Sequence, residues 1–570
     1  MHSRRAVWLA WVCACSIGPR EEAGFAEAET GSDPTATPTS TEPTPQSDAS
    51  SGSDGGTGSS SDDEGSGGPK LDVAGGDTDA LDMCKPGEEL SAPGPCDTVA
   101  PPDSFDPVLQ WAFEIDPITN LPLQATTIPL VGNFTDDNGD GEIDLCDTPD
   151  VLLVADLFVG YSLPCALYLL DGATGSVHWQ RSASQVAAAC LGTPAFADID
   201  DDGLPEIVLL YKDPATGNNG LQALEHDGSL KWSTLAVGAG ATEPFFGGAS
   251  VTITDLEDDG SAEIIVGHAV FDRDGDLLWE DPPPIWQEAE TSTAADLDGD
   301  GDLEVITGHS AYEHDGTLLF DLHPTIPTTS FPQIGNLDGD PDPEILLTTS
   351  DGIVLAEHDG TITFGPVRPT GVAIENVATW MRPATIHDFD GDDEAEWAHA
   401  SRDFYAVYQG PNAGDILWTA TVADVTGGAA GTAFDFLGDG VAEAMYADEY
   451  DLGVYDGATG KQVLTTERCS PTYIEYPVVA DVDNDGSAEI LVVSTVCMDG
   501  SPRKPALQVF RDAEDRWIQA RRIWNQHAYH VTNVREDGTL PSPPVNNWET
   551  LNTFRTNAQI EGGTVCVPEG

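Results

Sequence analysis

The residues in this chain most able to do chemistry are carboxylates that recur in short loops at a fixed spacing. The clearest loop runs from Asp296 to Glu304, and acidic side chains occupy its positions one, three, five and nine. Clustered carboxylates supply the six to eight oxygen ligands, at about 2.3–2.6 Å, that Ca²⁺ prefers. Without a cation, acidic groups this close repel one another. The pattern therefore predicts a calcium-binding loop, in which Gly301 at position six allows a tight turn with positive φ.

Seven further loops follow the same plan, so the chain carries eight, with starting points 40 to 62 residues apart. The acid at position nine rather than twelve, and the flanking strands rather than helices, distinguish them from EF-hands. A single copy could be an ordinary Asp-Gly turn that needs no metal, but eight copies in phase favour calcium. The candidate ligands, loop by loop, are Asp136, Asn138, Asp140 and Asp144; Asp198, Asp200, Asp202 and Glu206; Asp255, Glu257, Asp259 and Glu263; Asp296, Asp298, Asp300 and Glu304; Asn336, Asp338, Asp340 and Glu344; Asp388, Asp390, Asp392 and Glu396; Asp435, Asp439 and Glu443; and Asp481, Asp483, Asp485 and Glu489.

Some loops depart from this pattern. The first carries an insertion before its strand, so that Asp150 could take the place of Asp144. Pro341 and Asp393 stand where the fifth and sixth loops would have the glycine of position six. The seventh loop has Leu437 at position three. We expect this loop to bind calcium weakly or not at all, and Leu437→Asp to restore binding.

The elements that must position these loops are short strands. In the second repeat, strand-like runs cover residues 206–211, 221–225, 229–232 and 249–253, with a hairpin turn at His226-Asp-Gly228. Four short strands in a repeat of this length are typical of a β-propeller blade. The predicted fold class is therefore all-β, a β-propeller of four-stranded blades, with eight blades preferred and seven possible. Val108–Trp111 resembles the last strand of a blade but precedes the first loop, so we expect it to close the ring.

Loops of the form Asp-x-Asp-x-Asp-Gly-x-x-Glu, each followed by an apolar strand, resemble the FG-GAP/VCBS repeats of integrin-α-like proteins. The resemblance covers roughly residues 105–520. It implies a β-propeller with calcium in its loops, often in cell-surface adhesion or recognition proteins. Residues 521–570 form a C-terminal extension, and its run from Arg522 to His530 resembles a tail found on some bacterial members of the family, with no chemistry attached to it.

The N-terminal residues resemble a bacterial export signal. Residues 1–15 place basic residues before a short apolar run, and Val12-Cys-Ala-Cys15 resembles a lipobox, which makes Cys15 the candidate lipidation site. Plain secretion is the alternative. Residues 16–80 are rich in Ser, Thr, Gly, Pro and Asp and are predicted to be a disordered linker, followed by a Cys-containing lead-in at 81–104. The predicted location is the outer membrane or cell surface as a lipoprotein, or otherwise the medium.

The cysteines and the charge agree with export. Ten cysteines are present, and the eight beyond the signal region favour disulfides. The preferred pairs are Cys84–Cys96, which closes a short loop, and Cys469–Cys497, whereas the pairing of the other four stays open. Lys plus Arg number 22 against 99 Asp plus Glu, a net charge of −77, which argues against a nucleic-acid partner.

Two classes of function remain. The leading hypothesis is a calcium-binding cell-surface recognition or adhesion propeller without catalytic activity, which binds an extracellular protein or glycan and contacts the membrane only through a lipid anchor. The alternative is a propeller-type enzyme. Asp198–Tyr211 resembles the loops of some polysaccharide lyases, and Asp171-Gly-Ala-Thr-Gly175 resembles a blade motif of quinoprotein dehydrogenases. A lyase needs basic residues along a polyanion cleft, and here they cluster only between Arg503 and Arg522.

Overall fold

The computed structural model describes residues 84–568, except for residues 86, 88–89, 102–103, 158–163, 218, 236–248, 282–290, 327–329, 350, 369–381, 411–414 and 425–428. The chain divides into two units, Met1–Asp77 and Thr78–Gly570, and all described residues belong to the second. The predicted signal, the lipidation site Cys15 and the 16–80 linker lie outside the described residues. Within the described part, no helix is long and apolar enough to cross a membrane.

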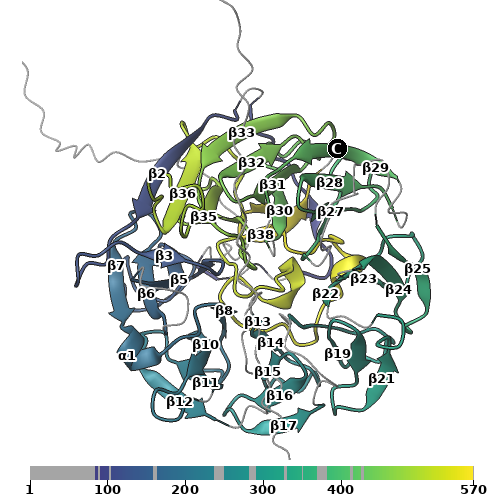
Figure 1. Cartoon of the computed structure of the whole chain (residues 1–570), viewed down its shortest axis with the longest axis horizontal. Helices are drawn as coiled ribbons and strands as arrows, with labels where there is room; N and C mark the ends of the chain where they lie inside the picture. Colours follow the sequence, from purple (N-terminus) through teal and green to yellow (C-terminus); the bar gives the residue numbers. More distant parts are fainter. Residues whose placement is uncertain are drawn as a thin grey trace, which may run out of the picture. The chain divides into compact units, whose positions relative to one another are not determined.

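The described residues of the second unit form eight antiparallel sheets, each of four strands apart from the five-stranded first. Each sheet runs outwards from a common centre, with its first strand innermost and its last strand at the rim (Figure 1). In chain order, sheets 1 to 8 are β3 (Gln124–Ala125), β4 (Leu130–Gly132), β5 (Asp150–Asp156), β6 (Ala166–Asp171) and β7 (Val177–Arg181); β9 (Ala195–Ala197), β10 (Glu206–Lys212), β11 (Asn219–Leu224) and β12 (Leu230–Thr234); β14 (Thr252–Thr254), β15 (Glu263–Val266), β16 (Ala269–Asp272) and β17 (Leu277–Glu280); β18 (Thr293–Ala295), β19 (Glu304–Ile306), β20 (Ser310–Tyr312) and β21 (Leu318–Asp321); β22 (Ser330–Gly335), β23 (Glu344–Thr349), β24 (Gly352–Glu357) and β25 (Ile362–Val367); β26 (Thr385–His387), β27 (Glu396–Ala400), β28 (Phe404–Tyr408) and β29 (Ile416–Thr421); β30 (Gly431–Phe434), β31 (Glu443–Ala447), β32 (Asp451–Tyr455) and β33 (Gln462–Glu467); and β34 (Val478–Ala480), β35 (Glu489–Val493), β36 (Leu507–Asp512) and β2 (Pro107–Phe113).

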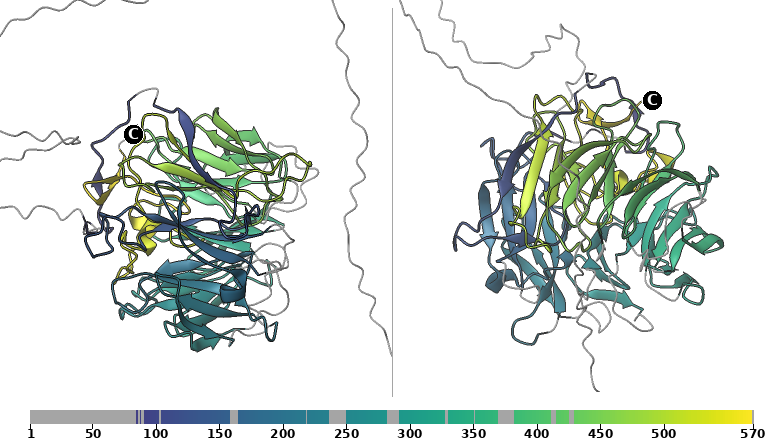
Figure 2. Two further views of the ribbon diagram at one scale, coloured as in Figure 1. Left: turned by 90° about the vertical axis from the view of Figure 1, so that its left-hand side faces the viewer. Right: turned by 45° about the horizontal axis from the view of Figure 1, so that its top comes forward.

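Sheet 8 joins the two ends of this unit. Its outermost strand β2 comes from the start of the unit and pairs antiparallel with β36, so that Pro107 faces Asp512 and Phe113 faces Leu507. Figures 1 and 2 show the purple strand beside the yellow one. The expectation that Val108–Trp111 supplies the last strand of the final sheet is therefore confirmed.

Neighbouring sheets are fastened at the rim by tryptophans of the outer strands. The indole N–H of Trp279 on β17 donates to the carbonyl of His314 in the hairpin of the next sheet, at 2.8 Å. A Cβ on Gly316 would lie 2.8 Å from the Trp279 ring, so glycine is required for this contact. Trp111 makes the same bond, to Gly172 at 2.6 Å, and thereby ties sheet 8 to sheet 1.

The C-terminal segment, defined as residues 520–567, fills the centre of the ring (yellow in Figure 1). Three consecutive residues serve three sheets: Trp524 bridges to β4, the carbonyl of Asn525 accepts from β9, and the side chain of Gln526 accepts from β14. Trp548 shares a hydrophobic cluster with β18. The segment then contacts sheets 5 to 8 in order, through Asn547 to Ile334, Phe554 to Ile386, Thr556 to Ala433 and Asn557 to Val479.

The remaining described elements are short. They comprise one helical turn, two 3₁₀ turns and two small sheets. In chain order they are β1 (Gly94–Pro95), α1 (Ala183–Val186), β8 (Gly192–Thr193), β13 (Ala249–Ser250), η1 (Val531–Asn533), η2 (Asn547–Glu549), β37 (Ile560–Glu561) and β38 (Thr564–Val567).

Four disulfides are present in the described part of the chain, Cys84–Cys146, Cys96–Cys566, Cys165–Cys190 and Cys469–Cys497. The predicted Cys469–Cys497 pair is confirmed, and the predicted Cys84–Cys96 pair is wrong. The short loop between Cys84 and Cys96 would close easily, but tertiary pairing separates its ends. β1 runs parallel to β38 and sets Cys96 beside Cys566, while the carbonyl of Cys84 accepts from Leu145 in the first acidic loop. Four disulfides are the pattern of an exported protein.

Candidate metal centres

The acidic loops occupy one place in the architecture, the connection between the first two strands of a sheet. In sheets 2 to 8 the glutamate of position nine is the first residue of the second strand, as Glu206 is of β10 and Glu304 of β19. The first strand ends directly before position one. This placement brings positions one, three and nine together: single carboxylate oxygens of Asp198, Asp200 and Glu206 lie within 4.8 Å of one another.

The carboxylate of the position-one aspartate accepts hydrogen bonds from main-chain N–H groups later in its own loop. In the second loop, Asp198 accepts main-chain N–H groups from Asp202 at 3.1 Å and Gly203 at 3.0 Å. In seven of the eight loops the residue at position six is left-handed, as Gly301 is with φ 101°, whereas the fifth loop has Pro341 there. Asp393 adopts φ 66° at the same place, which shows that the sixth loop keeps the turn at the expense of some backbone strain.

The glutamate of position nine presents one oxygen to the protein and leaves the other without a partner in several sheets. In every loop from the second to the eighth, one oxygen accepts the main-chain N–H of position two, as Leu297 donates to Glu304 at 2.6 Å. The other oxygen of Glu304, Glu344 and Glu489 is buried and has no hydrogen-bond partner among the described residues. A buried carboxylate oxygen without a partner is costly, so these atoms are suited to bind a cation.

The electrostatics of the loops agree with this view. Burial raises the pKa of Glu304 and Glu396 to about 8 and that of Glu344 to about 7, and the neighbouring loop aspartates add to the shift. The pKa of Glu489 is raised well above its ordinary value, first by burial and then by Asp481. A divalent cation would oppose these shifts because it favours the charged form of the carboxylates.

In the first loop, Asp150 rather than Asp144 stands where the other loops have their glutamate. Asp150 begins β5, is fully buried and accepts the N–H of Phe134 at 2.9 Å. The insertion carries Asp144 out of this position, and its carboxylate accepts the N–H of Cys146 instead. Asp147, which the sequence pattern missed, is buried and accepts main-chain N–H groups from Asp137 and Asn138, both at 3.0 Å.

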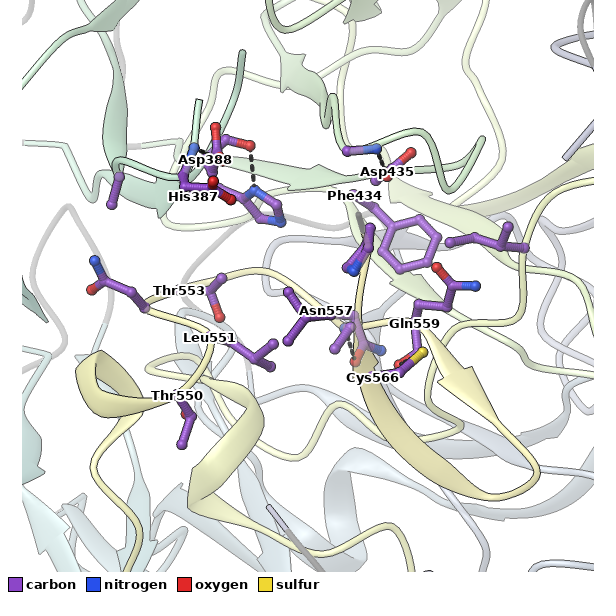
Figure 3. A pocket seen from close by; sticks show the side chains of 18 of the residues that line it. His387, Asp388, Phe434, Asp435, Thr550, Leu551, Thr553, Asn557, Gln559 and Cys566 are labelled. Atoms are coloured by element: carbon purple, nitrogen blue, oxygen red, sulfur yellow. Dashed lines mark hydrogen bonds between the residues drawn. The ribbon is translucent and has the colours of Figure 1, made fainter. Parts of the chain in front are cut away.

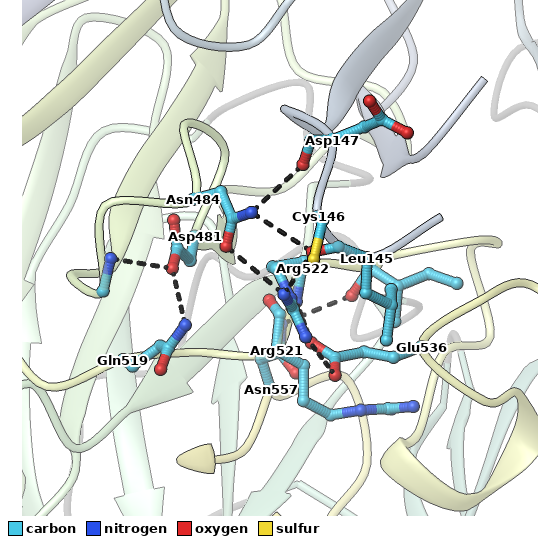
Figure 4. A network of polar contacts seen from close by, with 12 residues as sticks. Leu145, Cys146, Asp147, Asp481, Asn484, Gln519, Arg521, Arg522, Glu536 and Asn557 are labelled. Atoms are coloured by element: carbon cyan, nitrogen blue, oxygen red, sulfur yellow. Dashed lines mark hydrogen bonds and ion pairs between the residues drawn. The ribbon is translucent and has the colours of Figure 1, made fainter. Parts of the chain in front are cut away.

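The first and eighth acidic loops lie side by side where sheets 8 and 1 meet, and a residue of the C-terminal segment contacts both loops (Figure 4). Arg522 pairs with Glu536 at 3.0 Å and donates to the carbonyl of Leu145 at 2.7 Å. Asn484 of the eighth loop donates to Leu145 and Asp147 of the first, at 3.2 and 3.1 Å. The arginine is thus a positioning residue for two acidic loops.

The seventh loop is covered by the lead-in segment. Ala100 donates its N–H to the carbonyl of Leu437 at 2.7 Å, and Leu437 packs against a hydrophobic cluster that includes Ala100, Phe436 and Trp517. The leucine at position three is therefore explained by packing. Asp435 and Glu443 of this loop are buried, and burial raises both pKa values.

A cavity of about 220 Å³ adjoins the sixth and seventh loops. It opens between the ends of β26 and β30 and the C-terminal segment, and Asp388 and Asp435, the position-one residues of the two loops, contribute to its lining (Figure 3). From the other side Asn557 and Gln559 face it. The cavity, whose lining mixes polar and apolar side chains, therefore lies next to two candidate metal centres.

Comparison with known proteins bears on the fold. No protein-family model matches the chain, and no curated protein matches its sequence. The chain is similar to the V. cholerae biofilm matrix protein Bap1, with 21% identity and a TM-score of 0.66, covering 83% of this chain and all of the other. It also matches the Bacillus licheniformis rhamnogalacturonan lyase PL11 at 16% identity over 81% of this chain and 82% of the lyase, with a TM-score of 0.46. The first likeness concerns the propeller-like fold alone, and the second is too low to carry an argument. The assignment to FG-GAP/VCBS repeats stays a prediction.

Proposed function

We propose that this chain is an exported, calcium-binding recognition or adhesion protein without catalytic activity. In this proposal the eight sheets are the blades of an eight-bladed β-propeller, and their acidic loops are repeats of the FG-GAP/VCBS kind. The observation that carries the proposal is the buried carboxylate oxygen of Glu304, Glu344 and Glu489 that has no partner in the described part of the chain. Carboxylates at positions one, three and nine would hold Ca²⁺, the hard cation that prefers such oxygens.

The role of calcium in this proposal is structural. Position one directly follows the innermost strand and position nine begins the second, so an ion held by both fastens the first connection of a blade. Bound metal stabilises the native state by mass action, by about 2.7 kcal/mol for one independent site at a free concentration a hundred times its dissociation constant. Several sites together would make the folded state depend on extracellular calcium.

The recognition half of the proposal concerns an extracellular protein or glycan. The net charge of −77 disfavours nucleic acid as the ligand. The basic residues that a polyanion-cleaving enzyme would need are engaged within the protein: Arg511 pairs with Asp515, Arg516 with Asp512 and Arg522 with Glu536. The C-terminal segment occupies the centre of the ring (Figure 1). These features favour recognition over a lyase or quinoprotein dehydrogenase.

One experiment tests both halves. Purified protein, in millimolar calcium and in EDTA, is screened against glycan and extracellular-protein arrays and is incubated with polyanionic polysaccharides. We expect calcium-dependent binding without cleavage. Release of unsaturated oligosaccharides would establish the lyase alternative, and equal melting temperatures in calcium and EDTA would exclude calcium from the proposal.

Attachment to a membrane is part of the same proposal. A lipid on Cys15 would anchor the protein, with residues 16–80 as a tether between the lipid and the propeller. Cys15→Ser should then move the protein from the membrane fraction to the medium. Unchanged fractionation, with no lipid found by mass spectrometry on the wild-type protein, would show that it is secreted without an anchor.

A further inference from the structure

The outermost strands of the eight sheets share an irregularity, and in sheets 1, 2 and 8 the side chain at this point contacts the acidic loop. In sheet 2, Ala223 pairs with Trp232 and Leu224 with Leu230, so that Lys231 between them has no opposite residue. This is a β-bulge, a device that redirects a side chain. The residues at the corresponding bulge of sheets 1 to 8 are His178, Lys231, Leu278, Leu319, Thr363, Leu417, Val463 and Gln110.

Polar bulge residues reach the acidic loop of their own sheet. Gln110 donates to Asp483 at 2.7 Å, and Nε2 of His178 lies 3.1 Å from Asp150. These contacts, made in sheets 8 and 1, show that the bulge position faces the candidate metal centre. The identity of the bulge residue therefore determines which side-chain group, charged, polar or apolar, lies next to the loop carboxylates.

Lys231 meets the second loop as a cation. Its ammonium nitrogen lies 2.6 Å from Asp200, 3.0 Å from Glu206 and 3.3 Å from Glu225. Glu206 is fully buried, and its oxygen in this contact corresponds to the one that has no partner in Glu304. The lysine thus supplies Glu206 with the cationic partner that Glu304 lacks among the described residues.

We propose that Lys231 is a built-in cation that replaces calcium in the second loop. The inference rests on the proposed function, because it assumes that other loops bind calcium. An ammonium group and Ca²⁺ would need the same oxygen of Glu206, and two cations at contact distance of one carboxylate repel each other. The second loop, although its acidic residues match the pattern completely, therefore takes no calcium.

The proposal extends to the other sheets as a rule: the charge of the bulge residue determines whether the acidic loop of that sheet binds calcium. Leu278, Leu319 and Leu417 bring no charge to the loops of sheets 3, 4 and 6, and these loops must obtain their positive charge from a divalent ion. The rule explains why the acidic pattern of a loop alone does not predict whether the loop binds calcium. The bulge residue that determines binding lies in another strand, 25 residues after Glu206 in sheet 2.

Exchange of bulge residues between two sheets tests the proposal. Bound calcium per protein is counted by elemental analysis after equilibrium dialysis, for the wild type, Lys231→Leu and Leu319→Lys. We expect Lys231→Leu to gain one calcium and Leu319→Lys to lose one. Lys461→Leu, which removes an exposed lysine from a hairpin of sheet 7, is the matched control and should keep the wild-type count.

Stability gives a second readout. In EDTA, Lys231→Leu should melt below the wild type because Glu206 loses its partner, and calcium should restore the melting temperature. Lys231→Ala serves as a smaller replacement if the leucine variant does not fold. A calcium count equal to that of the wild type in a folded Lys231 variant overturns the inference, whatever Leu319→Lys shows. A wild type that binds no calcium overturns the proposed function instead, so the two failures are distinct.

Discussion

At the scale of single residues, the glutamate of position nine links stability to calcium. Glu304→Gln keeps an oxygen for the N–H of Leu297 but removes a buried carboxyl that must be either protonated or charged. We expect the variant to melt higher than the wild type in EDTA near pH 7, because the folded protein no longer has to take up a proton at this site. Its calcium-dependent gain should be smaller by up to about 2.7 kcal/mol, the contribution of one site at a hundred times its dissociation constant.

The control for this variant is Asp274→Asn, at an exposed position of a hairpin turn. Both melting temperatures of the control should stay within the error of the wild-type values. A Glu304→Gln protein that shows the full calcium-dependent gain would mean that the fourth loop is a turn without metal.

The same buried carboxylates predict a pH dependence of the metal-free protein. Burial raises the pKa of Glu304 to about 8 from an ordinary value of 4.5. The folded state therefore holds a proton that the unfolded state has released, and its contribution to stability is lost as the pH rises through 8. In EDTA the melting temperature should fall between pH 6.5 and 8, and in calcium this fall should disappear because the metal replaces the proton.

The range above pH 6.5 separates this effect from the titration of His530, whereas His178, whose pKa the hydrogen bond to Asp150 raises, contributes in the same direction as the carboxylates. Burial lowers the pKa of His530 to about 3, so its contribution to stability is lost only as the pH falls below the ordinary histidine value of about 6.5. A flat or rising melting temperature in EDTA from pH 6.5 to 8 would contradict the assignment of the carboxylates.

Residue patterns located the loops but not every carboxylate that the fold places in them. Spacing alone identified Asp198, Glu206 and Glu304, since these positions follow the period of the repeat. It placed Asp144 at position nine because an insertion cannot be aligned without the strand that follows. The expectation that Leu437→Asp restores the seventh loop also fails physically, because Leu437 packs on the hydrophobic cluster of Ala100 and Trp517, where a new carboxylate would be destabilising.

At the scale of strands and sheets, we expect the tryptophans at the rim to contribute much of the free energy that holds neighbouring sheets together. Trp279→Ala removes the bond to His314 and the packing on Gly316. We expect a loss of about 3 kcal/mol in the free energy of unfolding, the lower end for tryptophan truncation, because Trp279 is only partly buried. Urea unfolding in saturating calcium measures it. Leu318→Ala, 51% exposed on β21, is the control and should cost far less.

The strands were predictable and the C-terminal segment was not. Strand and hairpin patterns repeat with the acidic loops, so that even β2, displaced to the start of the unit, could be recognised by its likeness to other outer strands. The C-terminal segment has no period, because successive residues such as Trp524 and Gln526 contact different sheets. Its long-range contacts also determine the Cys96–Cys566 pair, and local loop length gives no information about that pair.

At the scale of the whole ring, the C-terminal segment contacts the inner strands of the sheets, and the Cys96–Cys566 disulfide ties this segment to the start of the unit. Cys96 and Cys566 are separated by 470 residues, and loops of this length give disulfides their largest effect on the unfolded state. The double variant Cys96→Ser/Cys566→Ser should lose up to about 5 kcal/mol of stability, measured by urea unfolding under oxidising conditions. The Cys165→Ser/Cys190→Ser variant, whose cysteines are 25 residues apart, should lose less. Equal losses of stability in the two double variants would show that the Cys96–Cys566 disulfide adds nothing particular to the attachment of the C-terminal segment.

The pairing of β2 with β36 also constrains how the protein is made. β2 emerges from the ribosome early and must wait for residues 507–512 before it has a partner, and the inner strands must wait for Trp524 and the residues beyond it. The ring cannot be completed on the ribosome, which suits a chain that crosses a membrane unfolded. During that interval its strand edges are open to pairing with other chains, and the charge of −77 keeps such chains apart. A product cut short by a few dozen residues would have most of its sheets but no means of finishing the structure.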